Sequence, residues 1–199
     1  TENPELSVEE ILRPCVDPDL YKRVCTKEEA RDQLNLVSDC NIILSVMRNQ
    51  KRKLFNDLVD MFEEYLRYCV SKGNVELADK TYLYVHTSYP DVGYDFPIHA
   101  LKKGIAHKII MTYKCANCGW FGPAPFKGEL AYCDKCGHMS LHAPGTSNGV
   151  SDEQLNLIYN CADLYVQYSC CEGSGLPSLE ARLCEVPIMT TPYSASKDQ

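Results

Sequence analysis

Short apolar runs alternate with longer segments in which apolar residues recur at helical spacing. Nearly continuous apolar runs indicate buried strands of a parallel sheet. The runs expected to form strands are 41–47, 81–86, 107–113, 163–168 and 187–190. After the first run, apolar side chains recur at helical spacing from Leu54 to about Gly73, which predicts a long amphipathic helix. The alternation of strands and helices indicates an α/β fold with flanking helices on a parallel sheet.

Capping signals place most of the remaining helices. Thr26 and Ser151 each stand three residues before a Glu or Gln, which is the spacing of a capping box. We expect one helix to begin after Thr26 and another to run from Ser151 to Asn160. A short helix is expected at 96–103, and a last one is expected to start near Leu176, with a proline in its first turn.

Two Cys-x2-Cys pairs, each followed by glycine, interrupt the alternation after the third predicted strand. Cys115 and Cys118 form the first pair, and Cys133 and Cys136 form the second. Each pair can present two thiolates to one ion, and two such turns complete the tetrahedral shell of a zinc ribbon. All four positions are cysteine, so the site is closed, and a structural Zn²⁺ is expected rather than a catalytic one. We therefore expect a small zinc-ribbon insertion at 114–149.

The chain has 12 cysteines, and those outside the two pairs have no disulfide-framework spacing. We expect them to be small buried hydrophobic residues in a protein of a reducing compartment. The adjacent Cys170 and Cys171 lie next to the loop discussed below, so a reactive-thiol role is the alternative for them.

A glycine-rich loop joins the fourth predicted strand to the last predicted helix. Its residues are Glu172, Gly173, Ser174 and Gly175. The glycines let the backbone pass close to a ligand, and the free amides at the helix start suit an anion such as a diphosphate. Glu172 could accept hydrogen bonds from sugar-like hydroxyls, and Glu180, about one turn into the helix, could receive the vicinal hydroxyls of a ribose. Alternatively, both are solvated carboxylates near a helix start.

The sequence around this loop closely resembles a known signature. Glu-Gly-Ser-Gly-Leu-Pro-Ser-Leu-Glu-Ala at 172–181, followed by Glu-Val-Pro-Ile-Met at 185–189, resembles the donor site of retaining glycosyltransferases of the two-Rossmann-domain (GT-B) type, family four. Ser174 replaces an aromatic residue of that signature, and Glu185 replaces a glycine. Both glutamates of the signature are present.

The resemblance implies a Rossmann-like nucleotide-sugar-binding domain, which is half of a GT-B fold. It implies that Glu172 contacts the donor hexose as the catalytic residue and that Glu180 contacts the nucleotide ribose. The amides of Gly175 and Leu176, with Gly173 and Ser174 beside them, would hold the diphosphate. The implied reaction transfers a sugar from a nucleotide-diphosphate donor with retention of configuration.

A basic cluster follows the first predicted strand. By spacing, Arg48 and Lys53 match the Arg and Lys with which the same family grips the donor diphosphate, although the flanking glycines are replaced. Arg suits bidentate phosphate contact, and Lys acts as a point charge. Arg52 is the alternative to Lys53, and a simply solvated cluster is the alternative to both. The polar loop 87–93 ends the second strand, where parallel sheets place ligands; His86 there could line the site or be structural.

Length and charge limit the remaining possibilities. At 199 residues the chain can hold one substantial core and a small module: an entry segment at 1–25, the main domain at 26–113 and 150–199, and the ribbon. The net charge of −7 argues against nucleic acid as a partner. No apolar run approaches membrane-spanning length, and Thr1 to Glu10 lack a secretory pattern, so a cytoplasmic location is expected.

Two functions remain open at this stage. The first is a glycosyltransferase donor domain that binds a nucleotide sugar, depends on a missing N-terminal acceptor domain for its unknown acceptor, and is inactive alone. The alternative is a non-catalytic Rossmann-like binding module that uses its ribbon to dock protein or nucleic acid. Loss of nucleotide-sugar binding with retained ribbon-dependent docking would favour the alternative.

Overall fold

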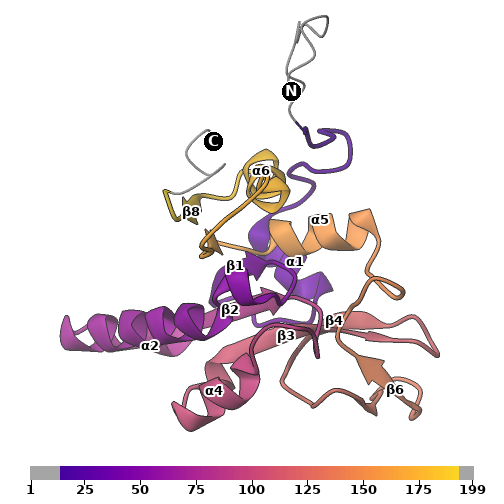
Figure 1. The fold of residues 1–199 in the computed structure, drawn as a ribbon, viewed down its shortest axis with the longest axis horizontal. Helices are drawn as coiled ribbons and strands as arrows, with labels where there is room; N and C mark the ends of the chain where they lie inside the picture. Colours follow the sequence, from indigo (N-terminus) through magenta and orange to yellow (C-terminus); the bar gives the residue numbers. More distant parts are fainter. Residues whose placement is uncertain (1–13, 193–199) are drawn as a thin grey trace, which may run out of the picture.

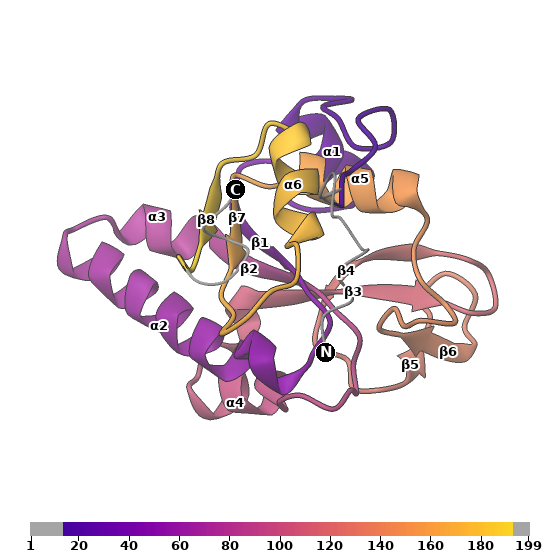
Figure 2. The ribbon, with the colours of Figure 1, turned by 45° about the horizontal axis from the view of Figure 1, so that its top comes forward.

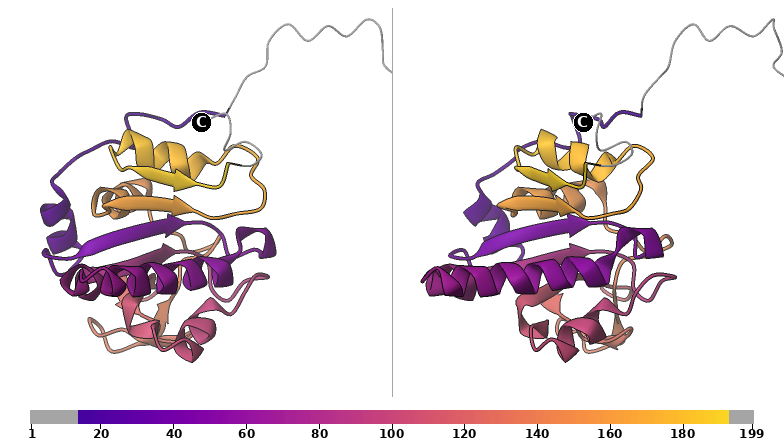
Figure 3. Two further views of the ribbon diagram at one scale, coloured as in Figure 1. Left: turned by 90° about the vertical axis from the view of Figure 1, so that its left-hand side faces the viewer. Right: turned by 60° about the vertical axis from the view of Figure 1, so that its left-hand side comes forward.

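The structure is a computed structural model, and it describes residues 14–192. The expected entry segment and the expected end of the main domain therefore lie partly outside the described residues. Five parallel strands form the centre of the sheet in the order β3-β2-β1-β7-β8 (Figure 1). They are β1 (Asn41–Val46), β2 (Thr81–His86), β3 (Ile109–Cys115), β7 (Leu164–Gln167) and β8 (Ile188–Thr190). Figure 3 shows β1, β7 and β8 running in the same direction.

The strand order reverses at β1. The chain moves outward from β1 to β2 and β3, then returns to the other side of β1 to form β7 and β8. At the carboxyl end of the sheet, the connections after β1 and β7 therefore lead to helices on opposite faces, α2 (Phe55–Ser71) and α6 (Leu176–Leu183). In open parallel sheets this topological switch point is where ligands bind.

Helices cover both faces of the sheet. One face carries α2 (Phe55–Ser71), α3 (Val75–Lys80) and α4 (Phe96–Lys102), and the other carries α1 (Lys27–Gln33), α5 (Asp152–Asn160) and α6 (Leu176–Leu183). Figure 1 shows α1, α5 and α6 on one side of the strands, and α2 and α4 on the other. Alternate residues of β1 enter two different cores: Ile42 and Leu44 pack with α1 and α5, whereas Ile43 packs with α2. This period of two explains the nearly continuous apolar runs.

The α/β prediction is confirmed, and most elements lie where the sequence places them. β2 matches its predicted range, and the capping boxes at Thr26 and Ser151 are both present. β3 begins two residues later than predicted because Ala106–Lys108 form a short 3-10 helix, and it ends two residues later, where β4 (Phe121–Pro125) pairs with it as far as Lys114. The short helix α3 was not predicted; it follows Gly73, which ends α2 with a φ of 81°.

The cysteine-rich segment is continuous with the main sheet. β4 pairs antiparallel with β3, and β6 (Met139–His142) pairs with the end of β3 at Lys114 and Cys115. β5 (Ala131–Tyr132) pairs in turn with β6. These strands lie together at the end of the sheet opposite β8 (Figure 2). β3 thus belongs to the parallel sheet and also ends in the first cysteine of the two pairs.

An ion-pair cluster anchors α1 to the sheet. Asp163, just before β7, accepts hydrogen bonds from Arg31 Nη2 at 2.5 Å, from Lys27 Nζ at 3.1 Å and from the backbone amide of Ile42 at 2.8 Å. The Arg31 side chain is only 5% exposed, and it also donates to the carbonyl oxygen of Cys161 at 3.0 Å. The guanidinium is therefore buried, and Asp163 is its counter-charge.

We expect Asp163→Ala to lower the free energy of unfolding by about 3 kcal/mol, because it leaves a buried guanidinium without its carboxylate. Lys27→Ala is the control: the Lys27 side chain is 34% exposed, and losing a partly exposed pair costs about 0.5 kcal/mol. Urea denaturation of the two variants measures the difference. Equal losses would show that Arg31 does not depend on this carboxylate.

Within residues 14–192, no helix combines the length and the apolar character needed to cross a bilayer.

Candidate functional site

Two loops meet at the switch point of the sheet. The loop after β1 contains the short 3-10 helix η1 (Lys51–Lys53), and the loop after β7 leads to α6. The backbone amide of Cys170 donates to the carbonyl oxygen of Arg52 at 2.9 Å, and Arg52 Nη1 donates to the carbonyl oxygen of Cys171 at 2.7 Å. These contacts hold the basic loop against the glycine-rich loop.

A buried ion pair lies where these loops meet. Lys53 Nζ donates to one carboxylate oxygen of Glu172, and Arg52 Nη1 contacts the other at 3.2 Å. The side chains of Lys53 and Glu172 are 9% and 6% exposed. Burial by itself would raise the pKa of Glu172, but the hydrogen bond and charge of Lys53, together with Arg52, hold that pKa below its usual value. Glu172 is therefore a carboxylate at neutral pH.

The sequence analysis assigned Lys53 to the donor diphosphate and Glu172 to the donor hexose, and it did not predict a contact between them. The structure brings them into direct contact. Arg52, named only as the alternative to Lys53, binds the same carboxylate.

Arg48 is held by a carboxylate that the sequence analysis did not name. Its Nε donates to Asp91 Oδ2 at 2.8 Å and its Nη2 to Asp91 Oδ1 at 3.2 Å. Arg48 holds the pKa of Asp91 well below its usual range, and the backbone amide of Val92 donates to the same side chain at 2.8 Å. The Arg48 side chain remains 54% exposed, so further N–H groups of the guanidinium face solvent. Asp91 lies in the polar loop after β2. Its place at the carboxyl end of a predicted strand was the signal in the sequence that could have identified it.

A cavity of 340 Å³ opens beside these loops. The ends of β1 and β2 contribute Arg48, His86 and Ser88, the loop before α5 contributes Thr146, and Pro177 contributes the first turn of α6. His86 hydrogen-bonds through Nδ1 to Thr112 Oγ1 at 2.9 Å. Burial lowers the pKa of His86 to about 4, so the imidazole is neutral at physiological pH. The cavity thus combines one cation with neutral polar groups.

The start of α6 borders the same cavity. Gly175 is the N-cap residue with a φ of 66°, in the left-handed region that glycine adopts without strain. The space that a Cβ on Gly173 would fill is open to 4 Å, so the backbone there can be approached closely. Ser174 and Leu176 flank Gly175. Of this helix start, Pro177 lines the cavity, whereas Gly173 to Leu176 are not among its lining residues.

Glu180 lies one turn further along α6. Tyr159 of α5 donates its hydroxyl to Glu180 Oε2 at 2.6 Å. Burial raises the pKa of Glu180 above its ordinary value. Glu180 is not among the residues that line the 340 Å³ cavity, whereas Pro177 on the same helix is. The charged residues predicted to bind the donor thus do not all line one cavity: Arg48 lines it, Lys53 contacts Glu172, and Glu180 contacts Tyr159.

The four paired cysteines converge at the carboxyl end of β3. The Sγ atoms of Cys115, Cys118, Cys133 and Cys136 all lie within 4.8 Å of one another, so they could hold one metal ion. The Cys115–Cys136 and Cys118–Cys133 sulfur distances are 3.7 and 3.8 Å. The glycines after the two pairs have φ values of 74° and 71°, which explains why glycine stands there.

The remaining cysteines were expected to be buried, and this is correct only in part. Cys40, Cys69, Cys161 and Cys184 are buried, but Cys15, Cys170 and Cys171 are exposed. The exposed thiols lie in the entry segment and in the loop after β7, outside the helices and strands that form the core.

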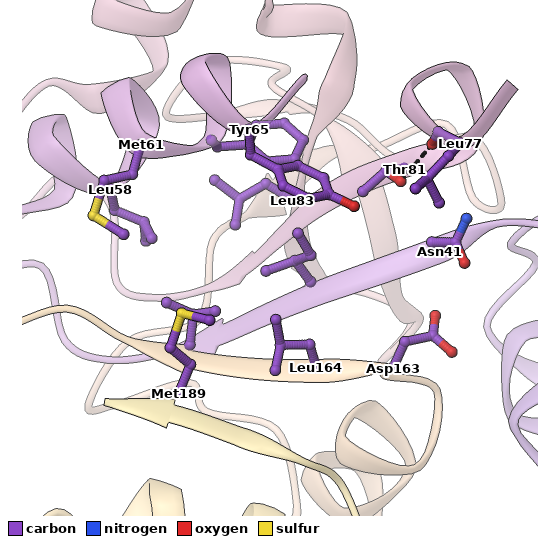
Figure 4. A pocket seen from close by; sticks show the side chains of 13 residues that line it. Asn41, Leu58, Met61, Tyr65, Leu77, Thr81, Leu83, Asp163, Leu164 and Met189 are labelled. Carbon is purple, nitrogen blue, oxygen red and sulfur yellow. Dashed lines mark hydrogen bonds between the residues drawn. The ribbon is translucent and has the colours of Figure 1, made fainter. Parts of the chain in front are cut away.

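A second cavity, of 260 Å³, lies between α2 and the strands β1, β7 and β8. Figure 4 shows Leu58, Met61 and Tyr65 facing Leu164 and Met189 across it, with the polar groups of Asn41 and Asp163 at one end. Asp163 is already bound to Arg31. This groove is apolar and lacks converging polar groups, so we place the candidate site at the switch point instead.

Comparison with known proteins bears on the fold. No protein-family model and no curated protein matches the sequence. The structure resembles sucrose-phosphate synthase from Thermosynechococcus elongatus, with a TM-score of 0.60 and 18% identity over 93% of this chain and 35% of that chain. It also resembles the C-terminal domain of a glycosyl transferase group 1 family protein from Francisella tularensis, with a TM-score of 0.53 and 11% identity over 89% of this chain and 71% of that chain.

The chain spans only 35% of the first of these proteins, and both are glycosyltransferases. The described residues have the α/β fold of one half of a GT-B glycosyltransferase.

Proposed function

We propose that this chain is the donor-binding domain of a retaining glycosyltransferase that uses a nucleotide-diphosphate sugar. The observation that carries the proposal is the meeting of Lys53 and Glu172 at the switch point, beside a cavity that contains Arg48 and the start of α6. Glu172 could thus accept hydrogen bonds from sugar hydroxyls, and Arg48 could donate hydrogen bonds to phosphates. Both lie at the edge where parallel sheets bind ligands.

Each residue has a role that its surroundings allow. Glu172, held as a carboxylate, accepts hydrogen bonds from the donor hexose and is the proposed catalytic residue. Arg48 and the amides of Gly175 and Leu176 bind the diphosphate, since the positive end of a helix dipole favours anions. Lys53 positions Glu172 and adds positive charge beside the phosphates. Glu180 receives the ribose hydroxyls, with Tyr159 orienting its carboxylate.

Catalysis by such a site would come from stabilising the diphosphate as it leaves. Positive charge and helix amides placed around the leaving group would stabilise its negative charge and lower the barrier, in place of a catalytic metal. The acceptor is proposed to bind a further domain, and the chain's coverage of 35% of its first structural neighbour supports that division. We therefore expect no transferase activity from this chain alone.

The four cysteines are proposed to hold a structural Zn²⁺. Their sulfur atoms fill all four positions of a tetrahedral site, which leaves no open position for a substrate. The ion would stabilise the ribbon and take no part in the transfer.

Calorimetric titration with UDP and with GDP tests the proposal. We expect saturable binding of one of them by the zinc-loaded protein, and Glu180→Ala to weaken it about tenfold, as expected for a hydrogen bond to a charged group. Glu180→Gln keeps an acceptor for Tyr159 and separates loss of charge from loss of packing. Glu28→Ala, which removes an exposed carboxylate from α1, is the matched control. A folded protein that binds neither nucleotide would overturn the proposal.

A further inference from the structure

The loop that returns from the ribbon to the main domain forms part of the candidate cavity. Pro144, Gly145, Thr146, Gly149 and Val150 line it together with residues from the ends of β1 and β2. One wall of the proposed donor site is therefore built by the segment that follows the cysteine cluster.

β6 connects the cysteine cluster to this loop. Its Leu141 pairs with Cys115, and Ser140 accepts the backbone amide of Ala116 at 2.9 Å. The Ser140 hydroxyl also lies 3.1 Å from the sulfur of Cys115. On the side of the second pair, the backbone amide of Cys133 donates to the carbonyl oxygen of His138 at 2.9 Å. Both cysteine pairs are thus hydrogen-bonded to β6 or to the residue just before it.

His142, at the end of β6, holds the loop. Its Nδ1 lies 2.9 Å from the carbonyl oxygen of Ala143, so this nitrogen carries the proton and Nε2 has a free lone pair. Asn148 Nδ2 lies 2.7 Å from that Nε2 and donates to it. The loop is further closed by a β-bridge between Gly145 and Asn148. Lys114 of β3 donates to the carbonyl oxygen of Gly149.

We infer that metal binding by the four cysteines holds the loop 144–150 in the shape that completes the donor cavity, so that nucleotide affinity depends on the metal. The metal fixes the two cysteine pairs, the pairs fix β6, and His142 of β6 fixes the loop through Asn148. The inference rests on the proposed function. It assigns the ribbon a role in donor binding although no cysteine of the cluster lines the cavity.

The test measures UDP and GDP binding by calorimetry for four forms of the protein: zinc-loaded wild type, zinc-free wild type and two variants. Wild-type protein freed of zinc by a chelator should bind at least tenfold more weakly than zinc-loaded protein. Asn148→Ala should keep one zinc per chain and bind about fivefold more weakly, as expected from the loss of one neutral hydrogen bond. Lys127→Ala is the control: its ammonium contacts Asp134 on the exposed side of the ribbon, and its zinc content and affinity should equal those of wild type.

The outcomes separate this inference from the proposed function. If zinc-loaded wild-type protein binds no nucleotide, the proposed function fails, and the inference fails with it. If wild type binds but zinc removal and Asn148→Ala leave the affinity unchanged, only the inference fails. Circular dichroism of the metal-free protein checks that the parallel sheet remains folded, and Asn148→Ala tests the coupling with the metal in place.

Discussion

Replacing one cysteine of the cluster, as in Cys118→Ser, is expected to weaken zinc binding more than about 100-fold, because serine does not supply a thiolate ligand. The consequence should extend beyond the ribbon. Cys115, Cys133 and Leu141 pack in the same core as Phe55 and Val85 of the main domain. Loss of the metal therefore loosens packing around β3, and we expect the midpoint of thermal unfolding to fall by about 10 °C. Zinc content and a thermal melt measure the two effects.

Cys15→Ser is the matched control for Cys118→Ser. Both cysteines are exposed residues, so the two substitutions are made at similarly exposed positions, and Cys118 belongs to the cluster whereas Cys15 does not. We expect Cys15→Ser to keep one zinc and the wild-type melting temperature. A zinc content that is the same in the two variants would contradict a metal site at the four cysteines.

Lys53→Met should lower the free energy of unfolding by about 3 kcal/mol at pH 7, because it removes the buried cation from the buried carboxylate of Glu172 and leaves a half-exposed cation as partner. That partner, Arg52, has a side chain that is 41% exposed. Arg52→Met should therefore cost less, about 1 kcal/mol. The double variant Lys53→Met, Glu172→Gln removes both charges and should recover most of the loss. Urea denaturation of the three variants gives these values.

The effect of Lys53→Met should depend on pH in a defined direction. The pKa of Glu172 is lowered in the folded protein, so its charge adds stability above its unfolded pKa of about 4.3, and this stability is lost as pH falls through the folded pKa. The difference between wild type and Lys53→Met should then be largest at neutral pH and shrink below about pH 4.3. Comparing the two proteins at each pH removes the contribution of other titrating groups. A difference that stays constant down to pH 3.5 would show that Lys53 acts through packing alone.

Much of the fold could be predicted from short stretches of sequence. Apolar runs marked the parallel strands, and the capping boxes at Thr26 and Ser151 marked two helix starts, because both signals are local. The positions of β4 and β6 could not be predicted in this way. Their pairing on β3 joins segments far apart in the chain, and nothing in the strand residues themselves specifies that partner.

In the candidate site, too, features within one short segment could be predicted, and contacts between distant segments could not. The two Cys-x2-Cys pairs were recognisable because both ligands of each pair lie in one turn, and Glu172 and Glu180 because they share one loop and helix. The contact of Lys53 with Glu172 spans 119 residues, and that of Arg48 with Asp91 spans 43. Such contacts depend on which loops the sheet brings together at its carboxyl edge.

By itself, then, the sequence determined the order of the parallel strands and of most helices, the four cysteines that could hold a metal ion, and the residue types available at the two loops. The tertiary structure alone decided that the charges of Lys53 and Glu172 neutralise each other and that Asp91 holds Arg48. It also decided that the loop after the ribbon closes the cavity. The physical reason is that burial and strand order, which no short segment encodes, determine which charged groups meet and how strongly they interact.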